Sequence, residues 1–455
     1  MTAVMTDAAD RPRSHLFYQT RQRRPRVDRA NGIHLWDVDG NRWIDGSSGA
    51  MVVNIGHSNP RVLAAMKDQI DRTTFAYRLH FENDAAEELA AEVARLMPGG
   101  LDRVFFVSGG SEAVESAIKL ARQWAIATGQ GTRYKVISRF PSYHGATLGA
   151  LALTGYAPMT APFAPMMVEM PKISAPTVWR DRDGLSAEEA ARRYADLLEE
   201  EILRQGPETV LAFIVEPIGG ASTGALVPPA GYLPRIREIC DRWGILLIHD
   251  EVMTGAGRTG RFLGADHWGV APDIAVLSKG FASGYAPLGA MVAPERIVEP
   301  VLDAGGFIHG YTYAGNPLAC AAGRAVLREV LEQDLIGNAA RMGTRLLDQL
   351  EGLKRRFPFI GDVRGKGLLT AIELIGDPDT LAPLPAELNA HSRLVEAAYS
   401  RGLIVYSRRT RGGYSGDHVI VAPPMIVTAA QIDEIVALLD AALADLAAQL
   451  DLPRG

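Results

Sequence analysis

The sequence predicts an α/β fold in which helices cover both faces of a mostly parallel central sheet. Short apolar runs recur through the middle of the chain, at 103–107, 134–138, 211–217, 245–251 and 274–280. These runs are apolar at consecutive positions, and helical patterns separate most of them. Strands that are buried on both faces and alternate with helices are typical of parallel sheets. The core is therefore expected to be a sheet enclosed between helices.

The elements can be followed along the chain. Residues 33–45 resemble a β-hairpin, because an Asp-Gly turn signal separates two short stretches of alternating large side chains. Residues 111–125 form a helical pattern whose apolar positions share one face. From about residue 325 the pattern becomes long amphipathic helices, and a last helix rich in alanine and leucine begins at about residue 428.

This organisation predicts two domains, as expected for a chain of 455 residues. Residues 1–58 are expected to form an N-terminal arm and part of a small domain. Residues 59–324 are expected to form the large α/β domain, and residues 325–455 the rest of a small α+β domain. Both ends of the chain would thus contribute to the same smaller unit.

Composition excludes several classes of protein. The formal net charge of −6 argues against general nucleic-acid binding, and no apolar run approaches the length of a membrane span. The two cysteines, Cys240 and Cys320, lie within helix-like patterns and predict neither a disulfide framework nor a cysteine metal site. The histidines are scattered and lack the spacing of a zinc hydrolase, so no metal is expected. A cytoplasmic protein is predicted.

Three ionisable residues lie at the carboxyl ends of predicted strands, where open α/β sheets bind ligands. These residues are Glu216, Asp250 and Lys279. Desolvation disfavours the charge of a buried lysine and lowers its pKa, which makes Lys279 a candidate nucleophile. Alternatively, Lys279 extends from a strand end into solvent.

The stretch "SGGSEAVES", residues 108–116, follows the predicted strand 103–107 and opens a helix. Glycines allow backbone N–H groups to approach an anion, and the helix N-terminus favours negative charge. A phosphate would be held well there. The alternative is a plain helix cap, with Ser108 or Ser111 satisfying free amides.

A phosphate cradle, a lysine amine and a buried carboxylate together are the groups that bind pyridoxal 5′-phosphate (PLP). Lys279 would hold the cofactor aldehyde as a Schiff base. Asp250 would keep the ring nitrogen protonated, so that the ring can withdraw electrons. The turn at 108–111 would bind the phosphate.

The chain resembles the class III aminotransferases, PLP enzymes of fold type I. The likeness is carried by "HDEVMTGAGRTGRFLGADHWGVAPDIAVLSKG" at 249–280 and extends over nearly the whole chain. It includes "WDVDGNRWIDGSSG", "SGGSEAVESAIKLAR", "SYHGAT", "EPIGG", "GYTYAGNPLACAAG" and "APPMIVT". The resemblance implies roles for cofactor-binding residues, which are Lys279, Asp250, Glu216, Val252 and Tyr143 around the ring and Gly109, Gly110 and Ser111 at the phosphate.

Thr312 matches a threonine that reaches the phosphate of the neighbouring subunit, which implies a homodimer with shared active sites and leaves a tetramer open. Each of these positions also has a plainer interpretation. Tyr143 and Val252 could be ordinary core residues, and Thr312 could be a turn residue.

Two positions depart from the family pattern. Many relatives have a serine at the position of Gly109, so one hydroxyl contact to the phosphate is expected to be missing. Tyr406 stands where many relatives have the arginine that recognises a substrate carboxylate. Arg408, Arg409 or Arg411 would then serve from a longer loop, and Arg409 is the expected reader; the alternative is that all three are solvated.

The substrate pocket is expected to include Phe17, Tyr18 and Met51, which match pocket-lining positions of relatives, although packing explains them as readily. The implied reaction is transfer of an amino group from an ω-amino acid or amine donor to a 2-oxo acid, such as pyruvate or 2-oxoglutarate, through pyridoxamine phosphate. An aminomutase, a decarboxylase or a racemase on the same scaffold is the alternative with the same cofactor.

A dinucleotide-binding dehydrogenase is the alternative from a different class. The run "GAGRTG" at 255–260 resembles the G-x-G-x-x-G fingerprint. That fingerprint belongs between the first strand and helix of a βαβ unit. Here it follows a middle strand and runs into a stretch without a helical pattern, so this alternative is disfavoured.

Overall fold

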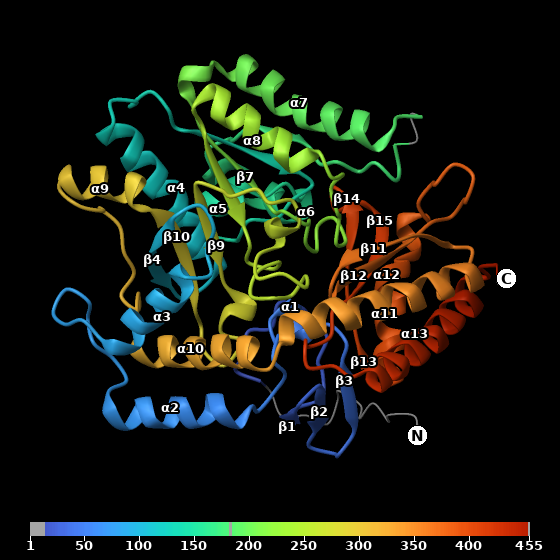
Figure 1. Cartoon of the computed structure of the whole chain (residues 1–455). Coiled ribbons are helices and arrows are strands. Elements are labelled where there is room, and N and C mark those ends of the chain that lie inside the picture. The colour runs from blue at the N-terminus through green and yellow to red at the C-terminus, as the bar shows by residue number, and fades with distance from the viewer. Residues whose placement is uncertain (1–13, 182–183, 454–455) are drawn as a thin grey trace.

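A computed structural model describes residues 14–181 and 184–453 of the chain. Figure 1 shows a large sheet with its helices on one side of the molecule and the C-terminal helices and strands on the other. The first thirteen residues of the predicted N-terminal arm lie outside the described residues. No helix within the described ranges is long and apolar enough to cross a membrane.

The large sheet has seven strands. Their spatial order is β4 (Leu101–Val107), β10 (Gly289–Pro294), β9 (Ile274–Leu277), β8 (Leu246–Asp250), β7 (Val210–Val215), β5 (Lys135–Phe140) and β6 (Lys172–Ser174). Only β10 runs antiparallel to its neighbours, so the predicted mostly parallel sheet is confirmed. The apolar runs of the sequence did not predict β10 or the three-residue β6.

Helices cover both faces of this sheet, as predicted. Alternate residues of β7 face opposite ways: Phe213 and Val215 pack against α7 (Ala187–Gln205) and α8 (Tyr232–Trp243), whereas Ala212 and Ile214 pack against α4 (Gly110–Ala127). Figure 1 shows α7 and α8 together in green along the top of the sheet. Because both faces are covered, every residue of β7 is buried, which explains its unbroken apolar run.

Several helix boundaries follow from capping residues. Asn59 accepts hydrogen bonds from the first turn of α2 (Pro60–Arg72), whose first residue is proline. Ser186 and Glu189 form a capping box at the start of α7, and α8 ends at Gly244 in the left-handed conformation. The other helices of the first 332 residues are α1 (Ser48–Met51), α3 (Asp84–Ala94), α5 (Leu148–Leu153), α6 (Ala157–Thr160), α9 (Glu295–Asp303) and α10 (Pro317–Glu332).

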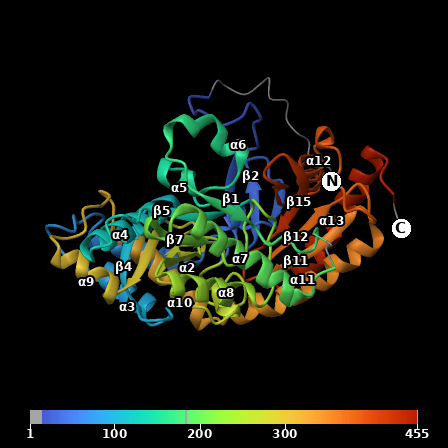
Figure 2. The same cartoon turned by 90° about the horizontal axis from the view of Figure 1, so that it is seen from above.

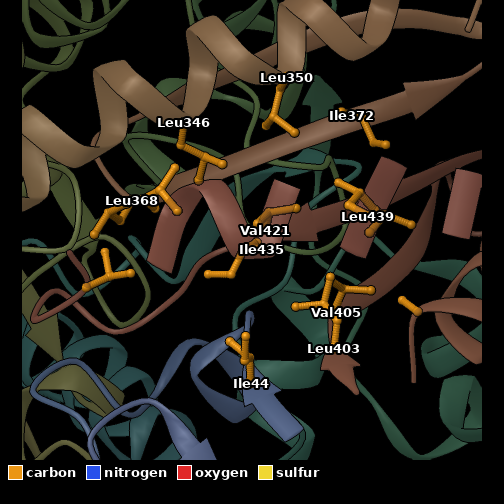
Figure 3. Close-up of a cluster of buried hydrophobic side chains, with 14 of the residues drawn as sticks. Ile44, Leu346, Leu350, Leu368, Ile372, Leu403, Val405, Val421, Ile435 and Leu439 are labelled. Carbon is orange, nitrogen blue, oxygen red and sulfur yellow. The ribbon is translucent and has the colours of Figure 1, made fainter. Parts of the chain in front are cut away.

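The chain ends in helices packed on two small sheets. The helices are α11 (Leu335–Arg356), α12 (Ala390–Ser400) and α13 (Ala429–Leu450). One sheet is antiparallel, in the order β11 (Ile360–Lys366), β12 (Leu369–Leu374), β15 (Ser415–Val421) and β14 (Tyr406–Arg411). Its inner face and the helices share an apolar core, part of which is drawn in Figure 3.

The other small sheet joins the two ends of the chain. Its order is β1 (Val27–Asn31), β2 (His34–Asp37), β3 (Arg42–Asp45) and β13 (Leu403–Ile404). Strands β2 and β3 are the hairpin that the sequence predicted at 33–45. Leu403 pairs in parallel with Ile44, and Figure 3 shows Ile44 directed toward the side chains of the C-terminal elements. Seen from above in Figure 2, β1 and β2 lie between the large sheet and the C-terminal elements.

Candidate active site

A cavity of about 280 Å³ lies beyond the carboxyl ends of the parallel strands. Eight of the predicted site residues line it, namely Met51, Gly110, Ser111, Tyr143, Glu216, Asp250, Val252 and Lys279. Strands β7, β8 and β9 supply Glu216, Asp250 and Lys279 at or just after their last residues. The sheet topology therefore brings together three groups that are far apart in sequence, at the edge where such sheets bind ligands.

Lys279 presents its amine to this cavity from the turn that follows β9. Its backbone is in the left-handed region, with φ at +46°, which is uncommon for a residue with a side chain. Burial lowers the pKa of Lys279, and the nearby carboxylates of Asp250 and Glu216 oppose that shift. A lysine with a lowered pKa more often carries the unprotonated amine that reacts with a carbonyl group.

Asp250 is held by two hydrogen bonds. His144 Nδ1 lies 2.8 Å from Asp250 Oδ2, and the backbone N–H of Val252 donates to Oδ1 at 3.1 Å. Both side chains are buried, with Asp250 only 5% exposed. His144 therefore fixes the orientation of the carboxylate toward the cavity. His144 was not among the predicted site residues, although it directly follows Tyr143 in the "YHG" motif.

Glu251, the other half of the adjacent acidic pair, points away from the cavity. Its carboxylate accepts hydrogen bonds from the hydroxyl of Thr254 and from the backbone N–H groups of Gly264 and Ala265, the last at 2.9 Å. Burial raises the pKa of Glu251 to about 7. Glu251 thus anchors the loop that follows β8, while Asp250 lines the cavity.

The start of α4 forms a close-fitting cradle. A Cβ at Gly110 would lie 2.9 Å from Val252 Cγ1, and one at Gly145 would lie 2.7 Å from Ser111 Oγ. Ser111 Oγ also accepts a hydrogen bond of 3.0 Å from the N–H of Ala146. The first N–H groups of a helix have no intrahelical partners, so they are available to an anion.

These residues fit PLP. Lys279 supplies an amine for the cofactor aldehyde, and Asp250 is a buried carboxylate oriented by His144 for a protonated ring nitrogen. The first turn of α4, with Gly110 and Ser111, is suited to a phosphate. Each group stands on the same cavity, so one cofactor can engage all of them.

Comparison with known proteins decides the family. The family model for "Aminotransferase class-III" matches residues 18–443. This chain belongs to the class III aminotransferases. It is therefore a PLP-dependent aminotransferase of fold type I, and the dehydrogenase alternative is excluded by this membership.

Relatives of this class III aminotransferase agree along almost its full length. The uncharacterized aminotransferase YodT of Bacillus subtilis is 40% identical over 416 residues, covering 91% of this chain and 94% of that protein. The putrescine–pyruvate aminotransferase of Pseudomonas aeruginosa is 33% identical over 414 residues, covering 90% and 89%.

Solved structures give the same result. The (S)-enantioselective ω-transaminase of Thermomicrobium roseum superposes with a TM-score of 0.90 at 39% identity, covering 95% of this chain and 96% of that one. A PLP-bound amine transaminase from an uncultivated Pseudomonas species superposes with a TM-score of 0.89 at 37% identity, covering 96% and 99%.

Not every predicted site residue reaches the cavity of its own chain. Phe17 is 98% exposed and Tyr18 is 43% exposed, and neither lines the cavity. Thr312 lies on an exposed turn before α10. Gly109 precedes α4 with an extended backbone and does not line the cavity either. In the described part of this class III aminotransferase, only Met51 of the three predicted pocket residues meets the cavity.

The structure corrects the choice of arginine. Residues 406–411 form strand β14 rather than a loop, so alternate side chains face opposite ways. Tyr406 and Arg408 line the cavity, whereas Arg409 lies on the other face. There its Nε donates to Asp417 Oδ1 at 3.0 Å, and its Nη2 donates to the carbonyl of Ala386 and to Asn389. Arg409 is thus occupied by structural contacts.

The glycine run "GAGRTG" has a packing role in this aminotransferase. A Cβ at Gly257 would lie 2.9 Å from Ile336 Cγ1, and one at Gly260 would lie 2.9 Å from the Cβ of Ala340. Both contacts are with α11. The run therefore allows α11 to approach closely, and it is followed by a four-residue 3-10 helix, Gly264–His267, rather than by the α-helix that the fingerprint requires.

Proposed function

We propose that this aminotransferase moves an amino group from an ω-amino acid or a simple amine to a 2-oxo acid. Support comes from the putrescine–pyruvate aminotransferase and the ω-transaminase among its relatives, and from an arginine at the cavity that suits a carboxylate. Pyruvate and 2-oxoglutarate are the expected acceptors. The observation that carries the proposal is the shared cavity of Lys279, Asp250 and Arg408.

PLP, when bound, supplies an aldehyde that links covalently to an amine and a ring that withdraws electrons. In our proposal Lys279 Nζ holds the aldehyde and later carries the proton of the donor's amine-bearing carbon. Asp250 Oδ2, held by His144, keeps a proton at the ring nitrogen. Gly109, Gly110 and Ser111 bind the phosphate.

Three further side chains surround the ring in this proposal. Tyr143 and Val252 cover its two faces, since both line the cavity next to Asp250. Glu216 lies at its edge. The carboxylate of Glu216 accepts hydrogen bonds from the N–H groups of Gly220 at 2.9 Å and Tyr143 at 3.3 Å, so it positions the loop that carries Tyr143.

Arg408 is the proposed reader of the substrate carboxylate. Its guanidinium lies 5.0 Å from the centre of the Tyr406 ring, and no carboxylate within residues 14–181 and 184–453 pairs with it. Arginine binds carboxylates through two parallel hydrogen bonds. An exposed guanidinium at the cavity can also turn away when the donor carries no carboxylate.

The reaction can be tested in a single turnover. Holoenzyme mixed with an amine donor and no acceptor should show a change in cofactor absorbance and release one equivalent of ketone or aldehyde per site. Lys279→Ala should abolish both signals. Release of carbon dioxide would indicate a decarboxylase, and an isomer of the donor an aminomutase; either result would contradict the proposal.

Replacement of Arg408 tests the substrate side. Arg408→Gln should raise the KM for pyruvate or 2-oxoglutarate by about 10- to 100-fold, since a charge-assisted hydrogen bond contributes roughly 1.5–3 kcal/mol. The first half-reaction with a carboxylate-free amine should be unchanged. Arg411→Gln is the matched control, because Arg411 lies on the opposite face of β14 and donates to the carbonyl of Leu381. Equal effects of both variants would count against Arg408.

We also propose that the protein is a homodimer with shared active sites. We propose that it resides in the cytoplasm. Thr312 adjoins exposed apolar side chains that would be covered by a second subunit, including Ile308 at 87% and Tyr313 at 64% exposure. The expected contact is between Thr312 and the phosphate bound by the other subunit. Cys240 and Cys320 are free thiols, which suits a reducing compartment.

A further inference from the structure

Arg258 is a buried arginine that the proposed reaction does not use. Its side chain is fully buried, and among the described residues it has no ion-pair partner. Burial lowers the pKa of Arg258 to about 10, and the charge of Asp45 only partly opposes that shift. Removing a cation from water costs several kcal/mol unless hydrogen bonds compensate. Its position therefore requires an explanation.

The guanidinium connects three separate stretches of the chain. Nη1 donates to the carbonyl of Pro423 at 2.5 Å and more weakly to those of Leu368 and Ala422, at 3.3 and 3.4 Å. Nη2 donates to Asn54 Oδ1 at 2.6 Å and to Ser48 Oγ at 3.0 Å. Arg258 itself belongs to the loop after β8, eight positions after Asp250.

Ser48 and Asn54 enclose the stretch that forms one wall of the active-site cavity. Ala50 and Met51, which lie between them, line the cavity. This stretch has an unusual backbone: Ser48 and Met51 have left-handed φ values of +50° and +56°. Left-handed conformations of residues other than glycine cost about 1–3 kcal/mol each and persist only where their surroundings hold them.

Asn54, which accepts a hydrogen bond from Arg258, also contacts the turn that carries Lys279. The amide of Asn54 packs so closely on Gly280 that a Cβ there would clash with it. Asn54 Nδ2 donates to the carbonyl of Ala256 at 3.2 Å, and its backbone carbonyl accepts from Met425 at 2.7 Å. Asn54, at one end of the 48–54 stretch, is therefore in contact with Gly280, the residue that follows Lys279.

We propose that Arg258 is a positioning residue for the donor-binding side of the pocket: through Ser48 and Asn54 it holds the Ala50–Met51 wall in place and keeps Ser48 and Met51 in their left-handed conformations. Lysine cannot replace it, because the three donors of an ammonium group share one nitrogen, whereas the planar guanidinium reaches the Pro423 carbonyl from Nη1 and the oxygens of Asn54 and Ser48 from Nη2. Loss of the guanidinium should let the wall relax and widen the space available to the donor. The effect on donor choice rests on the proposed use of amine donors, whereas the effect on the wall does not.

The experiment compares amide hydrogen exchange of residues 47–55 in the holoenzymes of wild type, Arg258→Lys and Asn54→Ala. Both variants should exchange at least tenfold faster there. They should also lose about tenfold in kcat/KM for a small amine, mainly through KM, and lose less for a bulky one. Arg237→Lys is the control, since Arg237 is a largely buried arginine of α8 that pairs with Asp273 at 2.8 Å, away from the cavity.

Two outcomes are decisive against the proposal. If exchange at 47–55 stays at the wild-type rate in both variants while stability falls as in Arg237→Lys, Arg258 only supports the fold. If amide hydrogen exchange at 47–55 is unchanged while the donor preference changes, Arg258 does not act through this wall and the proposal is also overturned. If the wild type turns over no donor at all, the proposed function fails, but the exchange measurement still decides the role of Arg258.

Discussion

Asp250 and Glu251 are adjacent carboxylates with separate tasks. Successive side chains leave a strand in opposite directions, so Asp250 faces the cavity and Glu251 faces the loop behind it. The His144 ring orients the first, and three hydrogen bonds satisfy the second. The acidic pair at the end of a buried strand is thus explained by two separate sets of hydrogen-bond partners.

Gly109 offers a residue-scale prediction. Its backbone is extended, with φ at −177°, and a Cβ there would meet nothing within 4 Å. Gly109→Ser should therefore be tolerated, and its hydroxyl should strengthen PLP binding about two- to tenfold, the value of one added hydrogen bond of roughly 0.5–1.5 kcal/mol. The measurement is the dissociation constant of PLP from the apoenzyme.

The neighbouring glycine provides the contrast. A Cβ at Gly110 would lie 2.9 Å from Val252 Cγ1, so Gly110→Ser should weaken PLP binding. If the two serine variants behave alike, the cradle at the start of α4 does not bind the phosphate as proposed.

His249 offers a second prediction, on stability. It is fully buried in β8, and its ring nitrogens have no hydrogen-bond partner within the described residues. Burial lowers the pKa of His249 from 6.5 to about 3, so the unfolded chain takes up a proton first as the pH falls. Stability is then lost below about pH 6.5, by roughly 1.4 kcal/mol per pH unit, until about pH 3.

Replacement of His249 by leucine should remove this acid sensitivity. Between pH 7 and pH 5 the wild type should lose about 2 kcal/mol more unfolding free energy than His249→Leu, as measured by urea denaturation. Parallel pH profiles of the two proteins would show that folding does not lower the pKa of His249.

At the scale of elements, strand β14 decided which arginine meets the cavity. The sequence predicts a loop for Arg408, Arg409 and Arg411, in which all three would have similar access to a substrate. Pairing with β15 makes the segment a strand, and the alternation of its side chains places Tyr406 and Arg408 on the cavity side. The local signal was weak because the charged residues obscured any apolar alternation.

Helix α13 gives a prediction at this scale. Thr428 Oγ1 accepts a hydrogen bond of 3.3 Å from the N–H of Gln431, and Gln431 Oε1 accepts one of 3.0 Å from the N–H of Thr428. Thr428→Ala should lower the free energy of unfolding by about 1 kcal/mol and leave kcat unchanged, because the cap lies outside the cavity. Thr428→Ser, which keeps the hydroxyl, should retain most of the stability. An equal loss in both variants would show that the threonine methyl group matters instead.

For the whole molecule, the shared active sites of the proposed dimer can be tested by mixing subunits. Lys279→Ala and Thr312→Ala should each lower activity alone. In a heterodimer of the two, one site combines an intact Lys279 with an intact Thr312 from the other subunit. Coexpressed subunits should therefore recover up to one normal site per heterodimer, measured as turnover after separation by affinity tags.

A failure to recover activity in that heterodimer would mean that Thr312 acts within its own subunit, and full activity of Thr312→Ala alone would mean that Thr312 has no role. Two wild-type subunits carrying the same tags provide the reference activity. A monomeric mass in light scattering would contradict the dimer directly.

The division into a large domain at 59–324 and a small domain from both chain ends remains a prediction. The pairing of β13 with β3 supports it, since Leu403 and Ile44, about 360 positions apart in sequence, are partners in one parallel strand pair. Limited proteolysis that releases residues 59–324 as one resistant fragment is the expected result.

The α/β class, the hairpin at 33–45 and the grouping of Lys279, Asp250 and Gly110 around one cavity were predictable from the sequence alone. Apolar runs, turn signals and the order of motifs are local properties, so they can be read along the chain. Three features became visible only in the folded chain: His144 holds Asp250, Arg408 rather than Arg409 lines the cavity, and Arg258 joins three distant stretches. Those outcomes depend on which strands pair and which loops meet, and residues far apart in sequence determine both.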